Sequence, residues 1–473
     1  MLPKIKIGQH KHTRQVGSFR PRKGEMWYNK LMNIYISGIS GTGMGPLALM
    51  AQEAGMTVFG SDLQPGAVTN ELVNSGIKIC LGEQDGEYLK ARAKAEGVDW
   101  FVYTSALPED HPELVMAKKL KIKRITKRDE LISYLVKKLK LKMVAVAGTH
   151  GKTTTTAMIV WVCKQLGIPV SYLIGTTLPF APAGSYDPKS EYFVSEADEY
   201  DRNFLAFHPW LAVIPVVSYD HPDIYPTMQE YQEAFKQFEA QSEMVLYGDE
   251  IATDVELAGE ARRYDATLAI DAVMRMLPEA RGLARFTNSR RKKIIQAVNK
   301  FPGVGRRFEQ VSEGYYSDYA HHPEEVQATV QIALEEAERR GLKGVVAVYE
   351  PHQNTRQAGI IEEYTEAFEG LAKLYWVPTY LTREDPKLKT LQPADFISKL
   401  SNKKIAEAAE LDEKLGEALL AWHKKGYLIL LMTAGPGDVW LRKLVYAGNQ
   451  ESAATRFIHA PRSAADGSDR YGE

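Results

Sequence analysis

The clearest chemical signal in the sequence is a glycine-bounded turn that ends in lysine and threonine. It lies between an apolar β-type stretch, residues 143–147, and an apolar stretch of helical character that begins at residue 157. Glycines let backbone N–H groups approach a polyphosphate, a helix N-terminus adds partial positive charge, and lysine adds a full charge. A threonine hydroxyl can bind Mg²⁺. These features predict a phosphate-binding loop made of Gly148, Thr149, His150, Gly151, Lys152, Thr153 and Thr154.

The spacing G-x-x-G-K-T is shorter than the general G-x-x-x-x-G-K-[ST] pattern. A glycine turn with a solvated lysine is therefore the alternative. The strand before the turn and the helix after it favour the phosphate loop.

Two strand-type segments after this loop end in potential cation ligands. Residues 191–195 lead into Glu196-Ala197-Asp198-Glu199-Tyr200-Asp201, and residues 211–217 lead to Asp220 and His221. Open parallel sheets bind ligands at the carboxyl ends of their strands, and four carboxylates so close together are costly without a cation. Glu196 and His221 are therefore candidate Mg²⁺ ligands, although Mg²⁺ prefers oxygen. A solvated acidic turn is the alternative.

A second glycine turn lies near the start of the chain. A strand-type stretch, residues 33–37, precedes Gly38, Gly41 and Gly43, and a helix is expected over 46–54. The next expected strand closes on Asp62, where a βαβ nucleotide-binding half places a carboxylate for a ribose hydroxyl. The spacing is not G-x-G-x-x-G, so it gives no NAD signal, and a turn without a ligand is the alternative.

Arginines, histidines and one aspartate form a further group of candidates in the last third of the chain. A Pro/Gly segment that carries paired arginines predicts a hinge whose arginines face an anion, with a solvated linker as the alternative. Further candidates follow strand-type stretches, and ordinary loop histidines are the alternative for the three histidines among them. The residues are Arg306, Arg307, Asp318, His321, His322, His352 and Arg356.

The elements that must position these groups alternate between β and α type along the chain, which predicts an α/β fold of three domains. The first is a Rossmann-like domain, the second a P-loop ATPase-like domain, and the third again Rossmann-like. The expected limits are a basic extension 1–31, domains at 32–139, 140–308 and 309–445, and a disordered tail 446–473.

Composition excludes several classes of protein. The chain has 473 residues, 25% of them charged, with a net charge of −1, so nothing global indicates nucleic acid. Two cysteines, Cys80 and Cys163, fit a reducing compartment. No apolar run reaches membrane-spanning length, and the basic N-terminus lacks the apolar core of a signal peptide. We therefore expect a cytoplasmic protein.

Six motifs, taken in order, resemble those of the Mur ligase family, the ATP-dependent ligases that build the peptide of bacterial cell-wall precursors. They are G-T-H-G-K-T-T-T-T, E-A-D-E-Y-D, D-H-P-D-I-Y, G-V-G-R-R-F-E, D-Y-A-H-H-P and P-H-Q-N-T-R, and the resemblance covers about residues 32–443. In the first domain G-I-S-G-T-G-M-G, G-S-D-L and T-S-A-L are similar to the branch that adds L-alanine to UDP-N-acetylmuramate. The branch that recycles a preformed tripeptide is the near alternative.

The resemblance implies that ATP phosphorylates the muramate carboxylate and that the amino group of L-alanine attacks the acyl phosphate. ATP and Mg²⁺ are the implied cofactors, UDP-N-acetylmuramate and L-alanine the partners, without nucleic acid or membrane, in a monomer or dimer. Lys152 would bridge the β- and γ-phosphates, Thr153 and Glu196 would hold one Mg²⁺, and His221 a second.

The same resemblance gives roles to the other candidates. Arg307 would reach phosphate on domain closure, and Asp318 would contact the ATP ribose. The first-domain glycines and Asp62 would hold the UDP-sugar. The amino-acid side would be lined by His321, His322, His352 and Arg356.

The chain departs from the family pattern in its central domain. The segment between His221 and Arg306 looks shortened and carries no H-N-x-x-N element, which helps to hold adenine in the family; residues 264–267 are the candidate replacement. Two other classes of function therefore stay open. One is a non-catalytic muramyl-nucleotide binder, and the other is an unrelated P-loop ATPase or kinase.

Overall fold

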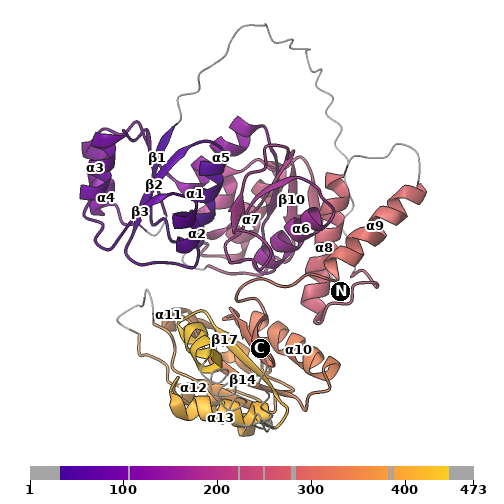
Figure 1. Cartoon of the computed structure of the whole chain (residues 1–473). Helices are drawn as coiled ribbons and strands as arrows, with labels where there is room; N and C mark the ends of the chain where they lie inside the picture. Colours follow the sequence, from indigo (N-terminus) through magenta and orange to yellow (C-terminus); the bar gives the residue numbers. More distant parts are fainter. Residues whose placement is uncertain are drawn as a thin grey trace, which may run out of the picture.

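The computed structural model describes residues 32–104, 107–221, 224–248, 251–277, 284–381, 384 and 388–446. Three sheets follow one another along this part of the chain, and Figure 1 shows the third below the first two. The predicted extension 1–31 lies outside the described residues. So do the predicted tail beyond residue 446 and the Ser-Ala pair of the T-S-A-L motif.

The first sheet has the strand order β3-β2-β1-β4-β5, and all its pairings are parallel. Its central strand β1 is almost fully buried, as expected for a parallel sheet covered on both faces. The elements are β1 Asn33–Ser37, α1 Met44–Glu53, β2 Thr57–Asp62, α2 Thr69–Asn74, β3 Lys78–Leu81, α3 Glu87–Ala95, β4 Trp100–Tyr103, α4 Pro112–Lys119, β5 Arg124–Lys127 and α5 Arg128–Leu139.

The second sheet has the order β11-β10-β6-β9-β7-β8, with only the short β8 antiparallel to its neighbour. Strand β10 ends at Ile214, three residues before the predicted end, because Pro215 has no N–H to donate. The elements are β6 Lys142–Val146, α6 Lys152–Gln165, β7 Val170–Leu173, β8 Gly184–Ser185, β9 Tyr192–Glu196, the 3₁₀ helix η1 Tyr200–Ala206, β10 Leu211–Ile214, α7 Met228–Ala240, β11 Val245–Tyr247, α8 Glu260–Met276 and α9 Ala284–Val298.

The third sheet has the order β12-β13-β17-β14-β15-β16, and β12 is its antiparallel edge strand. Strands β17 and β14 at its centre are wholly buried. The elements are β12 Glu309–Ser312, β13 Tyr315–Asp318, α10 Pro323–Arg339, β14 Val345–Glu350, α11 Asn354–Ile360, η2 Ile361–Tyr364, β15 Lys373–Trp376, α12 Pro393–Ile397, η3 Lys403–Ile405, β16 Ala406–Ala408, α13 Glu413–Lys424 and β17 Leu428–Thr433.

The predicted α/β architecture of three domains is therefore confirmed, while the predicted domain limits stay predictions. The sequence did not indicate the antiparallel edge strands β8 and β12. Within the described residues, no helix is both long and apolar enough to cross a membrane.

The domains are joined in two different ways. One hydrophobic cluster contains Ile36 of β1, Leu47 of α1 and Phe193 of β9, so the first two domains share a core. The third domain is tied to the second by polar contacts such as that of Arg263 Nη1 with Glu335 Oε2, at 2.8 Å. Polar contacts of this kind are typical of domains that move relative to one another.

Candidate active site

The phosphate loop connects β6 to α6 and is held against the chain that follows β10. Thr149 N donates to Val216 O at 2.7 Å. Gly148 has φ +150°, and a Cβ there would lie 2.7 Å from Val216 O. Gly151 has φ +82°, and a Cβ there would lie 2.5 Å from Asp265 Oδ1. Both glycines are therefore required by the close approach of neighbouring groups.

Lys152, Thr153 and Thr154 occupy the first turn of α6, as predicted. The Lys152 ammonium is folded back over its own loop. It donates to Gly148 O at 2.5 Å and to both carboxylate oxygens of Glu199 at 3.0 Å. Burial favours the neutral amine, but the nearby carboxylates, Glu199 foremost and then Asp198 and Glu196, outweigh burial and raise the pKa of Lys152 above its ordinary value. The loop therefore presents a charged lysine.

The acidic run after β9 spreads its carboxylates over different partners. Glu196 Oε2 accepts from Thr153 Oγ1 at 2.7 Å, and Glu196 Oε1 accepts from Gly175 N at 2.8 Å. Asp201 pairs with Lys127 at 2.6 Å. Glu199 is only 1% exposed and faces Lys152. Glu196, Glu199 and Asp201 thus have separate donors or countercharges in the folded chain, and the role of Glu196 as a Mg²⁺ ligand stays a prediction.

A cavity of about 240 Å³ lies where the first two domains and the hinge meet. Arg128, at the start of α5, reaches across it, and a Cβ on Gly43 would lie 2.1 Å from Arg128 Nη1. Glycine therefore leaves room for the guanidinium. The polar lining residues are Thr42, Arg128, Lys152, Thr153, Ser195, Glu196, Asp198 and Arg307.

The other predicted first-domain residues shape the glycine turn and do not line this cavity. Gly38 has φ +77°, and its N–H donates to Ser61 O at 2.9 Å. Gly41 N donates to Gly38 O at 3.1 Å. Asp62 Oδ2 accepts from Ser40 N at 2.8 Å. Asp62 thus holds the turn at the carboxyl end of β1.

The predicted pair of arginines diverges at the hinge. Arg306 Nη2 donates to Thr433 O at 2.7 Å, so this side chain binds the backbone of the third domain and does not line the cavity. Arg307 lines the cavity, and its Nη1 lies 3.6 Å from Glu325 Oε1. Positive φ at Arg306, +56°, turns the chain between the two side chains.

Glu325 of α10 contacts polar groups of both the second and the third domain. Its Oε1 lies 3.3 Å from His150 Nδ1, and its Oε2 lies 3.2 Å from His321 N. These cationic and donor groups outweigh burial and hold the pKa of Glu325 well below its ordinary value. Burial lowers the pKa of His321, so its imidazole is neutral near pH 7.

The chain after β10 faces the third domain. His221, with φ +58°, places Nε2 at 3.5 Å from Glu199 Oε1 and 3.6 Å from Asp220 Oδ2. Arg356 Nη2 lies 4.0 Å from Asp220 Oδ1. The rings of His352 and His321 lie 5.5 Å apart. Thus the predicted His221, His321, His352 and Arg356 lie around one interface.

Asp318 is occupied by backbone donors. Phe308 N and Ala320 N donate to its two oxygens at 2.6 and 2.7 Å, and the residue is buried. In this arrangement it fixes the turn that carries Arg307, because Phe308 follows that arginine directly. Contact with a ribose would require exchange of one of these bonds.

Sequence reasoning missed four residues that the structure places at this site: Arg128, Glu199, Asp265 and Glu325. Glu199 belongs to the acidic run 196–201, but no neighbouring residue indicates that it differs in role from Glu196. Glu325 follows the D-Y-A-H-H-P motif by two residues, and Asp265 belongs to residues 264–267, the candidate replacement for the adenine-binding element. Arg128 follows β5 directly, and its place after a strand was the available signal.

Two family models match the chain in order. The Mur ligase family catalytic domain matches residues 33–138, and the Mur ligase middle domain matches residues 146–267.

Relatives of known name align over most of the chain. The UDP-N-acetylmuramate–L-alanine ligase of Chloroflexus aggregans is 31% identical over 86% of this chain and 96% of its own. That of Symbiobacterium thermophilum is 28% identical over 90% and 96%.

Solved structures share the fold. The crystal structure of UDP-N-acetylmuramate-alanine ligase from Thermotoga maritima has a TM-score of 0.67 at 22% identity, covering 89% of this chain and all of that one. A murein peptide ligase from Psychrobacter arcticus has a TM-score of 0.56 at 21% identity, covering 88% and 98%. The chain has a phosphate loop, two domains that match the family models, and a relative that is 31% identical over 86% of this chain. The chain therefore belongs to the Mur ligase family.

Proposed function

We propose that the chain is an ATP-dependent ligase that joins L-alanine to the carboxylate of UDP-N-acetylmuramate through an acyl phosphate. The observation that carries the proposal is the shared cavity. It brings Arg128 and the first-domain glycine turn to the phosphate loop and to Arg307. Such a reaction must bring a substrate carboxylate and a polyphosphate together, so the positive charges belong at this junction.

The names of the aligned relatives supply the substrates in this proposal. The recycling of a preformed tripeptide has less support, because both relatives aligned by sequence above are named UDP-N-acetylmuramate–L-alanine ligase. The retained lysine, acids and histidines argue against a non-catalytic binder.

A magnesium ion fits the residues at the start of α6. Thr153 Oγ1 and Glu196 Oε2 lie 2.7 Å apart on the cavity wall, and both are oxygen donors of the kind that Mg²⁺ prefers. In the proposal these two residues hold one ion, and His221 belongs to a second. When bound, Mg²⁺ neutralises charge on the β- and γ-phosphates of ATP.

In the first half-reaction a muramate carboxylate oxygen attacks the γ-phosphorus and ADP leaves. Lys152 exchanges Glu199 for the β- and γ-phosphates, since its flexible stem can turn away from the carboxylate. Arg307 neutralises charge on the transferred group from the hinge side. Arg128 orients the muramate carboxylate from the first domain.

In the second half-reaction the amino group of alanine attacks the acyl carbon, phosphate leaves, and one proton is lost. His321 is suited to accept that proton because its imidazole is neutral. Arg356 serves as a clamp for the alanine carboxylate. Closure of the third domain excludes water from the acyl phosphate.

The test is phosphate release from ATP and Mg²⁺ in the presence of UDP-N-acetylmuramate. L-alanine, glycine, L-serine or the L-Ala-γ-D-Glu-diaminopimelate tripeptide is added in parallel. We expect release with L-alanine that depends on the UDP-sugar.

Release with the tripeptide alone would move the chain to the recycling branch. Phosphate release that does not depend on the UDP-sugar would indicate an unrelated phosphate-loop ATPase. Tight UDP-sugar binding without release under any condition would make the chain a binding protein.

A further inference from the structure

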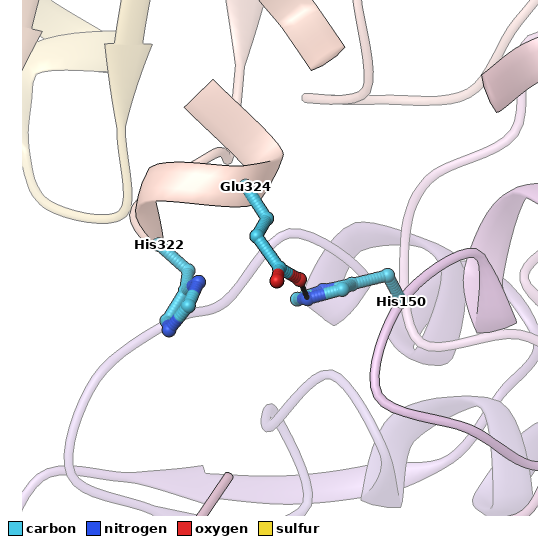
Figure 2. Close-up of side chains that lie close together, drawn as sticks. All are labelled: His150, His322 and Glu324. Atoms are coloured by element: carbon cyan, nitrogen blue, oxygen red, sulfur yellow. Dashed lines mark ion pairs between the residues drawn. The ribbon is translucent and has the colours of Figure 1, made fainter. Parts of the chain in front are cut away.

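Three side chains from two domains converge beside the phosphate loop. His150 belongs to that loop, whereas His322 and Glu324 come from the start of α10 in the third domain. Figure 2 shows Glu324 pointing at the ring of His150, with the ring of His322 alongside. One ligand atom from each of the three lies within 4.8 Å of the others, and His150 Nε2 is 3.3 Å from Glu324 Oε2.

Two of the ring nitrogens here have no hydrogen-bond partner. Among the described residues, His150 Nε2 and His322 Nδ1 are buried and make no hydrogen bond of acceptable geometry. An unsatisfied buried polar atom is costly, and coordination to a bound ion removes that cost. His150 Nε2 has only its ion-pair contact with Glu324 Oε2, and an ion held between these groups would satisfy both nitrogens.

His150 is also oriented as a metal-binding histidine is. Its Nδ1 lies 3.3 Å from Glu325 Oε1. A carboxylate on one ring nitrogen fixes the tautomer and leaves the lone pair of the other nitrogen facing outward, toward Glu324. Glu325 is itself held by His321 N at 3.2 Å.

We propose that His150, His322 and Glu324 form a site for a divalent transition-metal ion of the zinc type. Two imidazoles and one carboxylate suit zinc, which accepts three protein ligands and keeps a fourth position for water. Mg²⁺ prefers oxygen ligands whereas zinc also accepts imidazole, so this site differs from the oxygen pair proposed at Thr153 and Glu196.

The site has a structural consequence. One ligand lies on the phosphate loop and two lie on the third domain, so the ion binds only while the domains hold this arrangement. The ion is therefore a clamp between the two domains. The proposal does not depend on the ligase function, because metal binding can be measured without turnover.

The experiment titrates Co²⁺, as a spectroscopic substitute for zinc, into the full chain in excess Mg²⁺. His10 and His12 in the N-terminal segment could bind Co²⁺ as well, so both are replaced by Gln in the starting protein. We expect ligand-field bands of four-coordinate Co²⁺ that saturate at one ion per chain and that Zn²⁺ abolishes.

Glu324→Gln and His322→Gln should each weaken binding at least about tenfold, the size of effect known even for outer carboxylates. Glu324 is 56% exposed, so its replacement should leave the fold intact, which the metal-free thermal melt checks. The matched control variants are Glu338→Gln and His208→Gln. Glu338 is exposed near the other end of α10, and His208 is exposed in the central domain. Both variants should bind Co²⁺ as the starting protein does.

Weak, unsaturable Co²⁺ spectra would overturn the proposal. So would binding that survives Glu324→Gln and His322→Gln but is lost with Glu196→Gln, because the ion would then lie at the other site.

Discussion

The replacement Glu199→Gln tests how the phosphate loop holds its lysine before nucleotide binds. Glu199 is 1% exposed, and both of its oxygens accept from Lys152 Nζ at 3.0 Å. Glutamine has nearly the same shape but no charge. It therefore leaves the Lys152 ammonium beside a neutral amide, whose NH₂ group faces either Lys152 or His221.

The magnitude follows from burial. Removing one partner of a buried ion pair costs about 3–5 kcal/mol, because the remaining charge is uncompensated. Glutamine still offers one acceptor oxygen to Lys152, so we expect a loss near the lower end, about 3 kcal/mol of unfolding free energy. The pKa of His221, which Glu199 raises against the effect of burial, should fall in the variant.

The assay is urea denaturation of the nucleotide-free chain, repeated with a non-hydrolysable ATP analogue and Mg²⁺. The analogue supplies the missing countercharge to Lys152, so it should stabilise the variant more than it stabilises the original chain. Glu256→Gln is the control, an exposed glutamate of the same domain.

Two results would refute this reasoning. A variant as stable as the original chain would mean that the ion pair contributes nothing. A smaller stabilisation by the analogue in the variant would mean that Glu199 assists phosphate binding and does not compete for Lys152.

Three further predictions concern single side chains. Lys152→Ala should abolish UDP-sugar-dependent phosphate release while circular dichroism stays unchanged, and near-normal turnover would exclude the phosphate-loop role. Asp62→Ala removes the acceptor of Ser40 N, so calorimetry should show weaker UDP-sugar binding and little change for ATP; equal losses would contradict the role of the first domain. Burial raises the pKa of Asp265 from 3.8 to about 7, so the native state binds the extra proton and stability falls as the pH rises from 4 to 8. Asp265→Asn should therefore stabilise the chain by up to about 4 kcal/mol at pH 8 and by far less at pH 4, and a pH-independent difference in urea denaturation would contradict the shift.

Much of the fold was predictable because it is encoded locally. Parallel strands that are buried on both faces show as apolar runs, and the glycine turns and the Lys-Thr pair of the phosphate loop are written in adjacent residues. The end of β10 was missed because Pro215 interrupts an apolar run that otherwise continues to residue 217.

The sequence by itself determined that a phosphate loop stands after β6 and that acids and histidines follow the neighbouring strands. Only the tertiary structure decided which of them meet. Lys152 and Glu199 are 47 residues apart, and His150 and Glu325 are 175 apart. Such contacts depend on the order of strands in the sheet and on how the third domain rests against the second. Neither is set by local spacing, so the partners of Lys152 and His150 became visible only in the folded chain.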